Sequence, residues 1–402
     1  MFNNDVIDLL TSLGRAYIVG GSVRDAILGL PAKDLDIEVF DTDWDQLVEV
    51  GSKFGSVKTV GKTFSVLKLS HPTLGEIDLS LPRRENRIGV GHKGFKVTPD
   101  SSLTLTEAAS RRDFTINAIM WGLNGLNDPF FGKSDLETRI LRHVSDKFVE
   151  DPLRVLRGMQ FCSRFGLTAA PETVELCRSI ANRFHELSAD RIFTEWQKWA
   201  KGAHPSKGLF FLVQTGWIQH FPEITITNHA LRSVDIAAEV CSRNNITGDA
   251  RTAQLLAILC CSKSDACSFL TRINCPKSIA EKVVSLVPNR LVHCSGSITT
   301  AAVTRLAHKL APVTIQELAW HVEAINNGLP QAMQDILDIA RSLGILTSKP
   351  EPILLGRHLV QRGLKPGKDF TRILDAAFQA QLDCVFTDLA GAQDWLTKFL
   401  QG

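Results

Sequence analysis

The segment from Tyr17 to Phe40, YIVGGSVRDAILGLPAKDLDIEVF, constrains the fold more strongly than any other part of the sequence. Residues 17–19 favour a β-strand, and Gly20-Gly21 permits a tight turn after it. Ser22 is a residue type that caps helices, and the apolar side chains after it recur at helical spacing. The segment therefore predicts a strand, a tight turn and an exposed helix N-terminus, where backbone N–H groups can receive phosphate.

The next predicted strand, residues 35–40, carries a pair of carboxylates at its start. Asp34 and Asp36 are two positions apart, so in an extended chain they project from the same face. Carboxylate oxygens arranged in this way can share divalent cations. A phosphate cradle and a metal clamp are thus predicted within one short unit. Asp78, in the strand-like GEIDLSL, is a third carboxylate that we leave outside the predicted metal set.

Charge along the chain is nearly balanced, with a formal net charge of +2 over 402 residues. Binding to phosphate depends on local rather than total charge, and a basic, glycine-punctuated run lies between residues 83 and 112. The run contains three acidic residues, Glu85, Asp100 and Glu107. Its basic residues are more numerous: Arg83, Arg84, Arg87, Lys93, Lys96, Arg111 and Arg112. The run predicts a loop that contacts nucleic acid, and the alternative is an ordinary solvated loop.

The nine cysteines are scattered and include no CxxC pair. Most lie in apolar helical stretches, which is typical of reduced core cysteines in a cytoplasmic protein. Cys260 and Cys261 would point to different sides of a helix, which disfavours a metal site there. The first residues lack the pattern of a leader peptide, and no apolar run reaches the roughly 20 residues that span a bilayer. We therefore expect a cytoplasmic protein without a membrane partner.

The pattern of predicted elements changes along the chain. Up to about residue 145, helices and strands are mixed; beyond it nearly every segment has helical periodicity. This indicates an α+β fold class, with an α/β head followed by an all-α remainder. Joints are predicted at residues 201–207 and 348–352. In the head, helices are expected at residues 6–13, 44–54 and 105–110, and another helix is expected to start at Ser22. Strands are expected at residues 17–19, 35–40, 64–69 and 76–81.

Besides GGSVRD and Asp34-Leu35-Asp36, the sequence contains two further motifs, RRDFTINAI (111–119) and EDPLR (150–154). Together they resemble the polymerase-beta nucleotidyltransferase superfamily, specifically its class II branch of CCA-adding enzymes and bacterial poly(A) polymerases. The resemblance implies two Mg²⁺ ions on Asp34 and Asp36, one activating an RNA 3′-hydroxyl and one binding the triphosphate. It also implies that Gly20, Gly21, Ser22 and Arg24 form the phosphate turn. The alternative for Arg24 is an ion pair with Asp25 or Asp34.

The same resemblance divides the chain into a polymerase-beta-like head (1–145), a neck with the nucleotide base template (146–205), a helical body that binds RNA (206–346) and a helical tail that contacts tRNA (347–402). In RRDFTINAI it implies that Arg112 holds phosphate and Asp113 accepts a hydrogen bond from the ribose 2′-hydroxyl, with Asn117 in support. The alternative makes Asp113 a helix cap and Phe114, Ile116 and Ile119 core residues.

In EDPLR the resemblance implies that Asp151 and Arg154 pair with the incoming base, and Arg157 continues the pattern. Three positions apart, Asp151 and Arg154 share a helix face. Alternatively, Asp151 is an N-cap followed by Pro152 in the first turn. Gln160 stands where relatives often carry another arginine. Residues 190–195 resemble a supporting helix of the neck, and we expect Trp196 and Trp199 to be core residues.

The C-terminal half resembles the family only faintly. Some bacterial relatives carry a His-Asp metal phosphohydrolase here, but RTAQLLAILCCSKSD (251–265) has no His-Asp pair, and His229 stands alone. We therefore expect no phosphohydrolase chemistry. The tail resembles that of many bacterial members, which implies contacts between tRNA and basic residues such as Arg357, Lys365 and Lys368.

The expected function is the Mg²⁺-dependent, template-independent addition of CCA, or part of it, to the 3′ end of tRNA from CTP and ATP. The alternatives are a poly(A) polymerase, an enzyme that adds only the terminal A, and a non-catalytic RNA-binding homologue. Asp34, Asp36 and Asp113 argue against the non-catalytic alternative. A monomer or weak dimer is expected.

Overall fold

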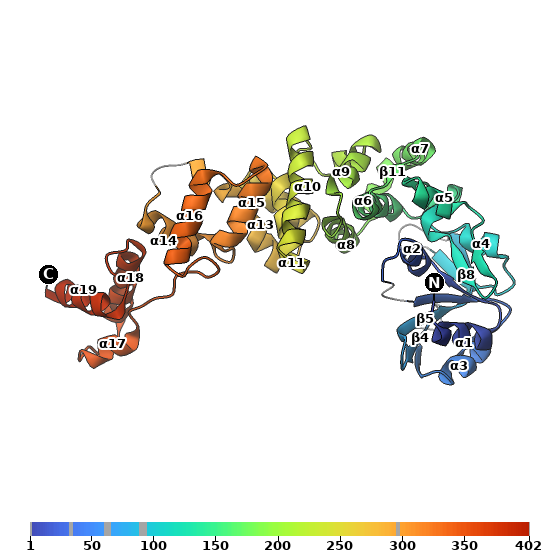
Figure 1. Ribbon diagram of the computed structural model, residues 1–402, viewed down its shortest axis with the longest axis horizontal. Helices are drawn as coiled ribbons and strands as arrows, with labels where there is room; N and C mark the ends of the chain where they lie inside the picture. Colours follow the sequence, from blue (N-terminus) through green and yellow to red (C-terminus); the bar gives the residue numbers. More distant parts are fainter. Residues whose placement is uncertain (1, 32–34, 60–65, 88–94, 295–297, 402) are drawn as a thin grey trace. The chain divides into compact units, whose positions relative to one another are not determined.

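The chain divides into two compact units, residues 1–220 and 221–402. The computed structural model describes residues 2–31, 35–59, 66–87, 95–294 and 298–401 (Figure 1). Strands and helices alternate in the first half of the first unit, and helices make up nearly all of the rest, which confirms the α+β class. The division into four parts stays a prediction.

The described part of the first unit contains a seven-stranded mixed sheet of order β3-β4-β5-β2-β1-β8-β9. The pair β2 and β5 is parallel, and the other neighbours are antiparallel. In the parallel pair, Asp36 lies opposite Asp78. The strands are β1 Ala16–Val19, β2 Leu35–Val39, β3 Ser56–Thr59, β4 Val66–His71, β5 Gly75–Ser80, β8 Met120–Gly122 and β9 Gly125–Asn127.

Short-range capping signals define the helices of the head. Asn3 caps α1, and Asp43 and Thr104 form capping boxes at α3 and α4. The helices are α1 Asn4–Leu13, α2 Gly21–Ile27, α3 Trp44–Ser52 and α4 Leu105–Ala109. Helices α1 and α3 contact each other and the strand layer (Figure 1).

The predicted N-cap at Ser22 was wrong. Helix α2 begins at Gly21, and Gly20 is its N-cap with φ of 71°. Glycine adopts this backbone conformation without the steric cost that a Cβ imposes. The chain therefore passes from strand to helix at Gly20, and Ser22 lies buried inside the first turn of α2.

The predicted basic loop was also wrong in part. Residues Arg83–Arg87 (β6) pair antiparallel with Phe95–Pro99 (β7), with Arg83 opposite Pro99. A two-stranded ribbon is held by backbone hydrogen bonds, so it needs no alternation of apolar residues that periodicity would reveal. Lys93 of the predicted basic run lies outside the described residues.

The second half of the first unit is built around α6, which packs against α8 and α9. Trp196 and Trp199 are fully buried and meet edge to face, which confirms them as core residues. One short parallel pair, β10 with β11, interrupts the predicted all-α region. The elements are η1 Thr115–Asn117, α5 Gly132–Glu137, β10 Ile140–Leu141, η2 Asp146–Glu150, α6 Leu153–Phe165, β11 Thr168–Ala169, α7 Pro171–Ser179, η3 Ala181–Glu186, α8 Ala189–Ala200, α9 Pro205–Gln214 and η4 Trp217–His220.

Every named element in the described part of the second unit is a helix, and one isolated bridge pairs Ile224 with Cys260. None of the described helices is both long enough and apolar enough to cross a bilayer. The elements are α10 Asn228–Arg243, α11 Gly248–Leu259, α12 Lys263–Arg272, α13 Lys277–Asn289, η5 Val292–Cys294, α14 Thr300–Leu310, α15 Ile315–Asn326, α16 Gln331–Ser342, α17 Gly356–Gln361, α18 Lys368–Leu382 and α19 Leu389–Gln401.

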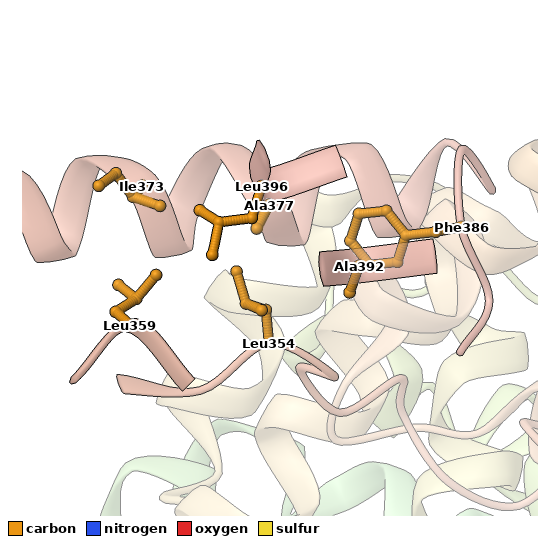
Figure 2. Close-up of a cluster of buried hydrophobic side chains, with 7 residues drawn as sticks. All are labelled: Leu354, Leu359, Ile373, Ala377, Phe386, Ala392 and Leu396. Carbon is orange, nitrogen blue, oxygen red and sulfur yellow. The ribbon is translucent and has the colours of Figure 1, made fainter. Parts of the chain in front are cut away.

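The last three helices share a hydrophobic cluster (Figure 2). Leu359 of α17 faces Ile373 of α18, and Leu354 faces Ala377 of α18 and Leu396 of α19. Burying a leucine, isoleucine or phenylalanine side chain contributes about 1.5–3 kcal/mol to the free energy of unfolding. The cluster therefore holds α17, α18 and α19 together; its buried members are Leu354, Leu359, Ile373, Ala377, Phe386, Ala392 and Leu396.

Candidate active site

A cavity of about 510 Å³ opens in the first unit where the β1–α2 turn, β2, η1, α6 and α8 meet. Among the described side chains that line it, eight are basic and three are acidic. Such a surplus of positive charge suits a polyanionic ligand. The lining residues are Gly20, Gly21, Arg24, Asp36, Arg111, Arg112, Asp113, Asn117, Asp151, Leu153, Arg154, Arg157, Gln160, Phe161, Arg164, Arg191 and Lys198.

Asp36 also lines a second cavity of about 360 Å³, which shares Arg111, Arg112 and Arg154 with the first. Asp78 lies in this second cavity, on the strand next to Asp36, and pairs with Lys68 at 3.1 Å. Asp36 thus stands where two cavities meet. Its predicted partner Asp34 lies outside the described residues.

The two glycines of the β1–α2 turn leave room for arginines. A Cβ on Gly20 would lie 3.1 Å from Arg112 Nη1, and one on Gly21 would lie 3.3 Å from Arg24 Nη2. A side chain at Gly20 would therefore crowd Arg112 as well as strain the backbone. Ser22 is not among the described residues that line the cavity.

Arg24 is 4% exposed and makes the alternative ion pair that the sequence suggested. Its Nη2 lies 2.7 Å from Asp25 Oδ1, and its Nη1 donates to Asn117 Oδ1 at 2.6 Å. The guanidinium also lies 4.5 Å from the centre of the Phe165 ring. Burial lowers the pKa of Arg24, although the Asp25 carboxylate opposes that shift. Arg24 therefore links α2 to η1 and α6.

Asp113 is the next member of the same buried network. Its Oδ1 accepts from the Phe114 N–H at 2.8 Å and from Asn117 Nδ2 at 2.9 Å, and its Oδ2 accepts from Arg157 Nε at 2.6 Å. Burial alone would raise the pKa of Asp113, but the charge of Arg157 and these hydrogen bonds outweigh it and lower the pKa. Asp113 is thus held as a carboxylate at the cavity wall. The predicted cap at Asp113 was wrong, because η1 begins at Thr115 and its N-cap is Phe114, whose N–H donates to Asp113. Phe114, Ile116 and Ile119 are core residues, as the alternative predicted.

Asp151 and Arg154 face the cavity from the start of α6, and both are held by other groups. Asp151 Oδ1 accepts from the Leu153 N–H at 3.1 Å, and its Oδ2 accepts from Arg191 Nη2 at 2.7 Å. Arg154 donates through Nη1 to the Lys147 carbonyl and through Nη2 to the Arg111 carbonyl, at 2.8 and 2.7 Å. Asp151 lines the cavity and accepts from the first N–H of α6, but the predicted N-cap at Asp151 was wrong, because Pro152 is the N-cap of α6. The pairing of Asp151 and Arg154 with the incoming base stays a prediction.

Comparison with known proteins accounts for this constellation. Residues 16–142 match the model of the poly(A) polymerase head domain, and residues 166–226 match that of a probable RNA- and SrmB-binding site of polymerase A. The "Multifunctional CCA protein" of Nitrosospira multiformis is 38% identical over 253 residues, which cover 57% of this chain and 58% of that protein. Residues 16–142 therefore carry a poly(A) polymerase head domain, and the chain is similar to proteins named for CCA addition. It spans about half the length of the curated relatives it matches.

Solved structures of CCA-adding enzymes share the fold over nearly the whole chain. The enzyme of Bacillus stearothermophilus in complex with CTP superposes with a TM-score of 0.76 at 21% identity, covering 100% of this chain and 98% of that one. The Thermotoga maritima enzyme complexed with tRNA superposes with a TM-score of 0.70 at 19% identity, covering 99% of this chain and 96% of that one. The chain thus has the fold of these CCA-adding enzymes, as the motifs implied.

Gln160, which departs from the pattern that the resemblance implies, is fully buried at the cavity wall. Its Oε1 accepts from Arg164 Nη1 at 3.3 Å, and Arg164 lines the same cavity one turn farther along α6. Positive charge therefore remains on this face of the helix despite the departure from the family pattern.

Sequence reasoning missed several residues of the cavity, namely Leu153, Phe161, Arg164, Arg191 and Lys198. Arg191, Glu195 and Lys198 recur at helical spacing in α8, which was the available signal for one shared face. Lys198 Nζ lies 2.8 Å from Glu195 Oε1. Helix α8 is thus part of the site as well as a support for it.

The candidate RNA-binding residues of the tail lie in the second unit. All three are exposed: Arg357 lies on α17, Lys365 lies between α17 and α18, and Lys368 is the first residue of α18. Cys260 is buried and Cys261 exposed, as expected for neighbours that point to different sides. The described residues hold no cluster of three or more His, Cys, Asp or Glu side chains placed to bind a metal.

Proposed function

We propose that this chain extends the 3′ end of tRNA, adding CCA or part of it from CTP and ATP in a template-independent reaction. The single observation that carries the proposal is Asp36, which lies at the meeting point of two cavities. A nucleotidyl transfer needs two substrates to meet at one metal-binding carboxylate, and the larger, cationic cavity suits the triphosphate. The names of the relatives support tRNA as the acceptor.

Magnesium fits the residues present, because Mg²⁺ is usually bound through one or two carboxylates and the substrate phosphates rather than by a full protein cage. Asp34 and Asp36 would hold it; bound there, it would lower the pKa of the attacking hydroxyl and neutralise developing charge. Arg112, beside the Gly20 turn, would bind phosphate oxygens. Asp113 would accept the ribose 2′-hydroxyl.

Base selection would follow from Asp151 and Arg154. On their Watson–Crick edges, C and A present an amino donor beside a ring-nitrogen acceptor, while U and G present a carbonyl beside a ring N–H. A carboxylate beside a guanidinium complements C and A, whereas U or G would set acceptor against acceptor and donor against donor. Arg154 still has donors to offer, because each Nη carries two N–H groups and its carbonyl contacts use one on each.

Poly(A) addition, or addition of the terminal A alone, would use the same residues. The deciding experiment offers CTP and ATP separately to tRNA that ends before CCA, to tRNA that ends after CC, and to an unrelated RNA. Addition of C to the first tRNA and A to the second would support the proposal. Addition of A alone to all three would replace it with the poly(A) polymerase alternative, and no addition to any would favour the non-catalytic homologue. A cytoplasmic location and a monomeric or weakly dimeric state stay predictions.

A further inference from the structure

Glu38 is a buried carboxylate next to the reaction site that no motif singled out. It follows Asp36 by two positions on β2, so the two side chains share one face of the strand. Glu38 is 2% exposed and lines the second cavity. Burying a carboxylate is costly unless it is paired, so its partners should explain its presence.

Those partners are the first two arginines of RRDFTINAI. Glu38 Oε1 accepts from Arg111 Nη2 at 2.8 Å, and Glu38 Oε2 accepts from Arg112 Nη2 at 3.4 Å. Each oxygen thus faces a different guanidinium. Both arginines line both cavities, and they are themselves mostly buried. Two adjacent guanidinium groups repel each other, and the carboxylate between them offsets that repulsion.

The arrangement reaches the phosphate turn and the base template. Arg112 extends from Glu38 to Gly20, where its Nη1 lies 3.1 Å from the position of a Cβ. The carbonyl of Arg111 accepts from Arg154 Nη2 at 2.7 Å. The Glu38 carboxylate therefore holds Arg112 beside the Gly20 turn directly. It supports Arg154 on α6 indirectly, through the backbone of Arg111.

We propose that Glu38 is a positioning residue for nucleotide binding, whose carboxylate holds Arg111 and Arg112 so that Arg112 faces the phosphates of the incoming nucleotide. The inference rests on the proposed function for the identity of the ligand. It assigns Glu38 contacts with the two guanidinium groups, one on each oxygen, and no direct contact with metal.

The test compares Glu38→Gln with wild-type protein in the full chain. KM for CTP and ATP should rise by roughly tenfold to a hundredfold, the range of a lost charge-assisted hydrogen bond, while kcat changes much less. Inhibition by tripolyphosphate should weaken by a similar factor, and inhibition by cytidine should not. Glu38→Asp, which keeps the charge, should recover part of the loss. The matched control is Glu49→Gln, an exposed residue of α3 that pairs with Lys53 and should change neither constant.

Unchanged KM and tripolyphosphate inhibition in folded Glu38→Gln would overturn the proposal. So would a fall in thermal stability and kcat with KM intact, because that result means packing alone. If Glu38→Gln does not fold, Glu38→Asp decides by the same two readouts. Equilibrium dialysis of labelled ATP separates this inference from the proposed function, since it measures nucleotide affinity even in a protein without transferase activity.

Discussion

Replacing Asp113 with Asn should abolish most of the discrimination between ATP and dATP. A carboxylate has about four acceptor positions, and the described neighbours of Asp113 fill three of them. The remaining position, on Oδ2, suits one ribose hydroxyl. A hydrogen bond to a charged group contributes about 1.5–3 kcal/mol, so the preference for ATP should fall by roughly tenfold to a hundredfold.

The same change should destabilise the protein. An amide at position 113 points its NH₂ either at Arg157 Nε or at the donors Phe114 and Asn117, and either orientation sets donor against donor. Breaking a buried ion pair in this way costs about 3–5 kcal/mol. Selectivity must therefore be measured below the unfolding transition of the variant, which circular dichroism locates.

The assay is addition of one nucleotide to tRNA that ends in CC, with kcat/KM determined for ATP and for dATP. Asp135→Asn is the matched control: Asp135 is equally buried, accepts from Thr115 Oγ1 at 2.7 Å and pairs with Arg142, yet it does not line the cavity. It should lower stability and leave the ratio unchanged. If folded Asp113→Asn keeps a ratio of kcat/KM for ATP to kcat/KM for dATP within about twofold of the wild-type ratio, the ribose contact is refuted.

Four further outcomes are expected. Asp36→Ala should lose nucleotide addition but keep tRNA affinity in a filter-binding assay, since affinity comes from many phosphate contacts; substantial turnover in Mg²⁺ would contradict the metal role. Arg154→Ala should lower CTP and ATP use by roughly tenfold to a hundredfold and narrow the gap to UTP and GTP, and unchanged selectivity would place the base template elsewhere. Burial in α15 lowers the pKa of His321 to about 3 from its usual 6.5, so the unfolded chain takes up a proton more readily than the folded protein. The free energy of unfolding should therefore fall as pH drops below 6.5, by about 2 kcal/mol at pH 5. In urea unfolding, His321→Leu should lack this pH-dependent loss, and an equal dependence of the unfolding free energy on pH in both proteins would contradict the prediction. Pure protein should not hydrolyse cyclic nucleotides to nucleoside monophosphates in Ni²⁺ or Mn²⁺, and hydrolysis that copurifies with it would reverse that expectation.

The head could be predicted well wherever its signals are local. Hydrophobic periodicity and caps located α1, β1, α3, β4 and β5 to within a few residues, and the buried pair Trp196 and Trp199 was expected as core. The hairpin of β6 and β7 carries no such periodicity and was missed. The start of α2 was misplaced, because the backbone conformation of Gly20 rather than the side chain of Ser22 begins the helix.

The motifs alone also indicated most of the residues that line the cavity, because each motif carries a chemistry that needs its neighbours close by. Their partners were decided by the tertiary structure. Arg24 meets Asn117 across 93 positions of sequence, and Glu38 meets Arg111 across 73. A periodic pattern records which face of an element is buried, but it holds no information on which distant side chain lies opposite. The parallel register that sets Asp36 beside Asp78, and the buried network from Asp25 to Arg157, arise only when β2, η1 and α6 are packed together.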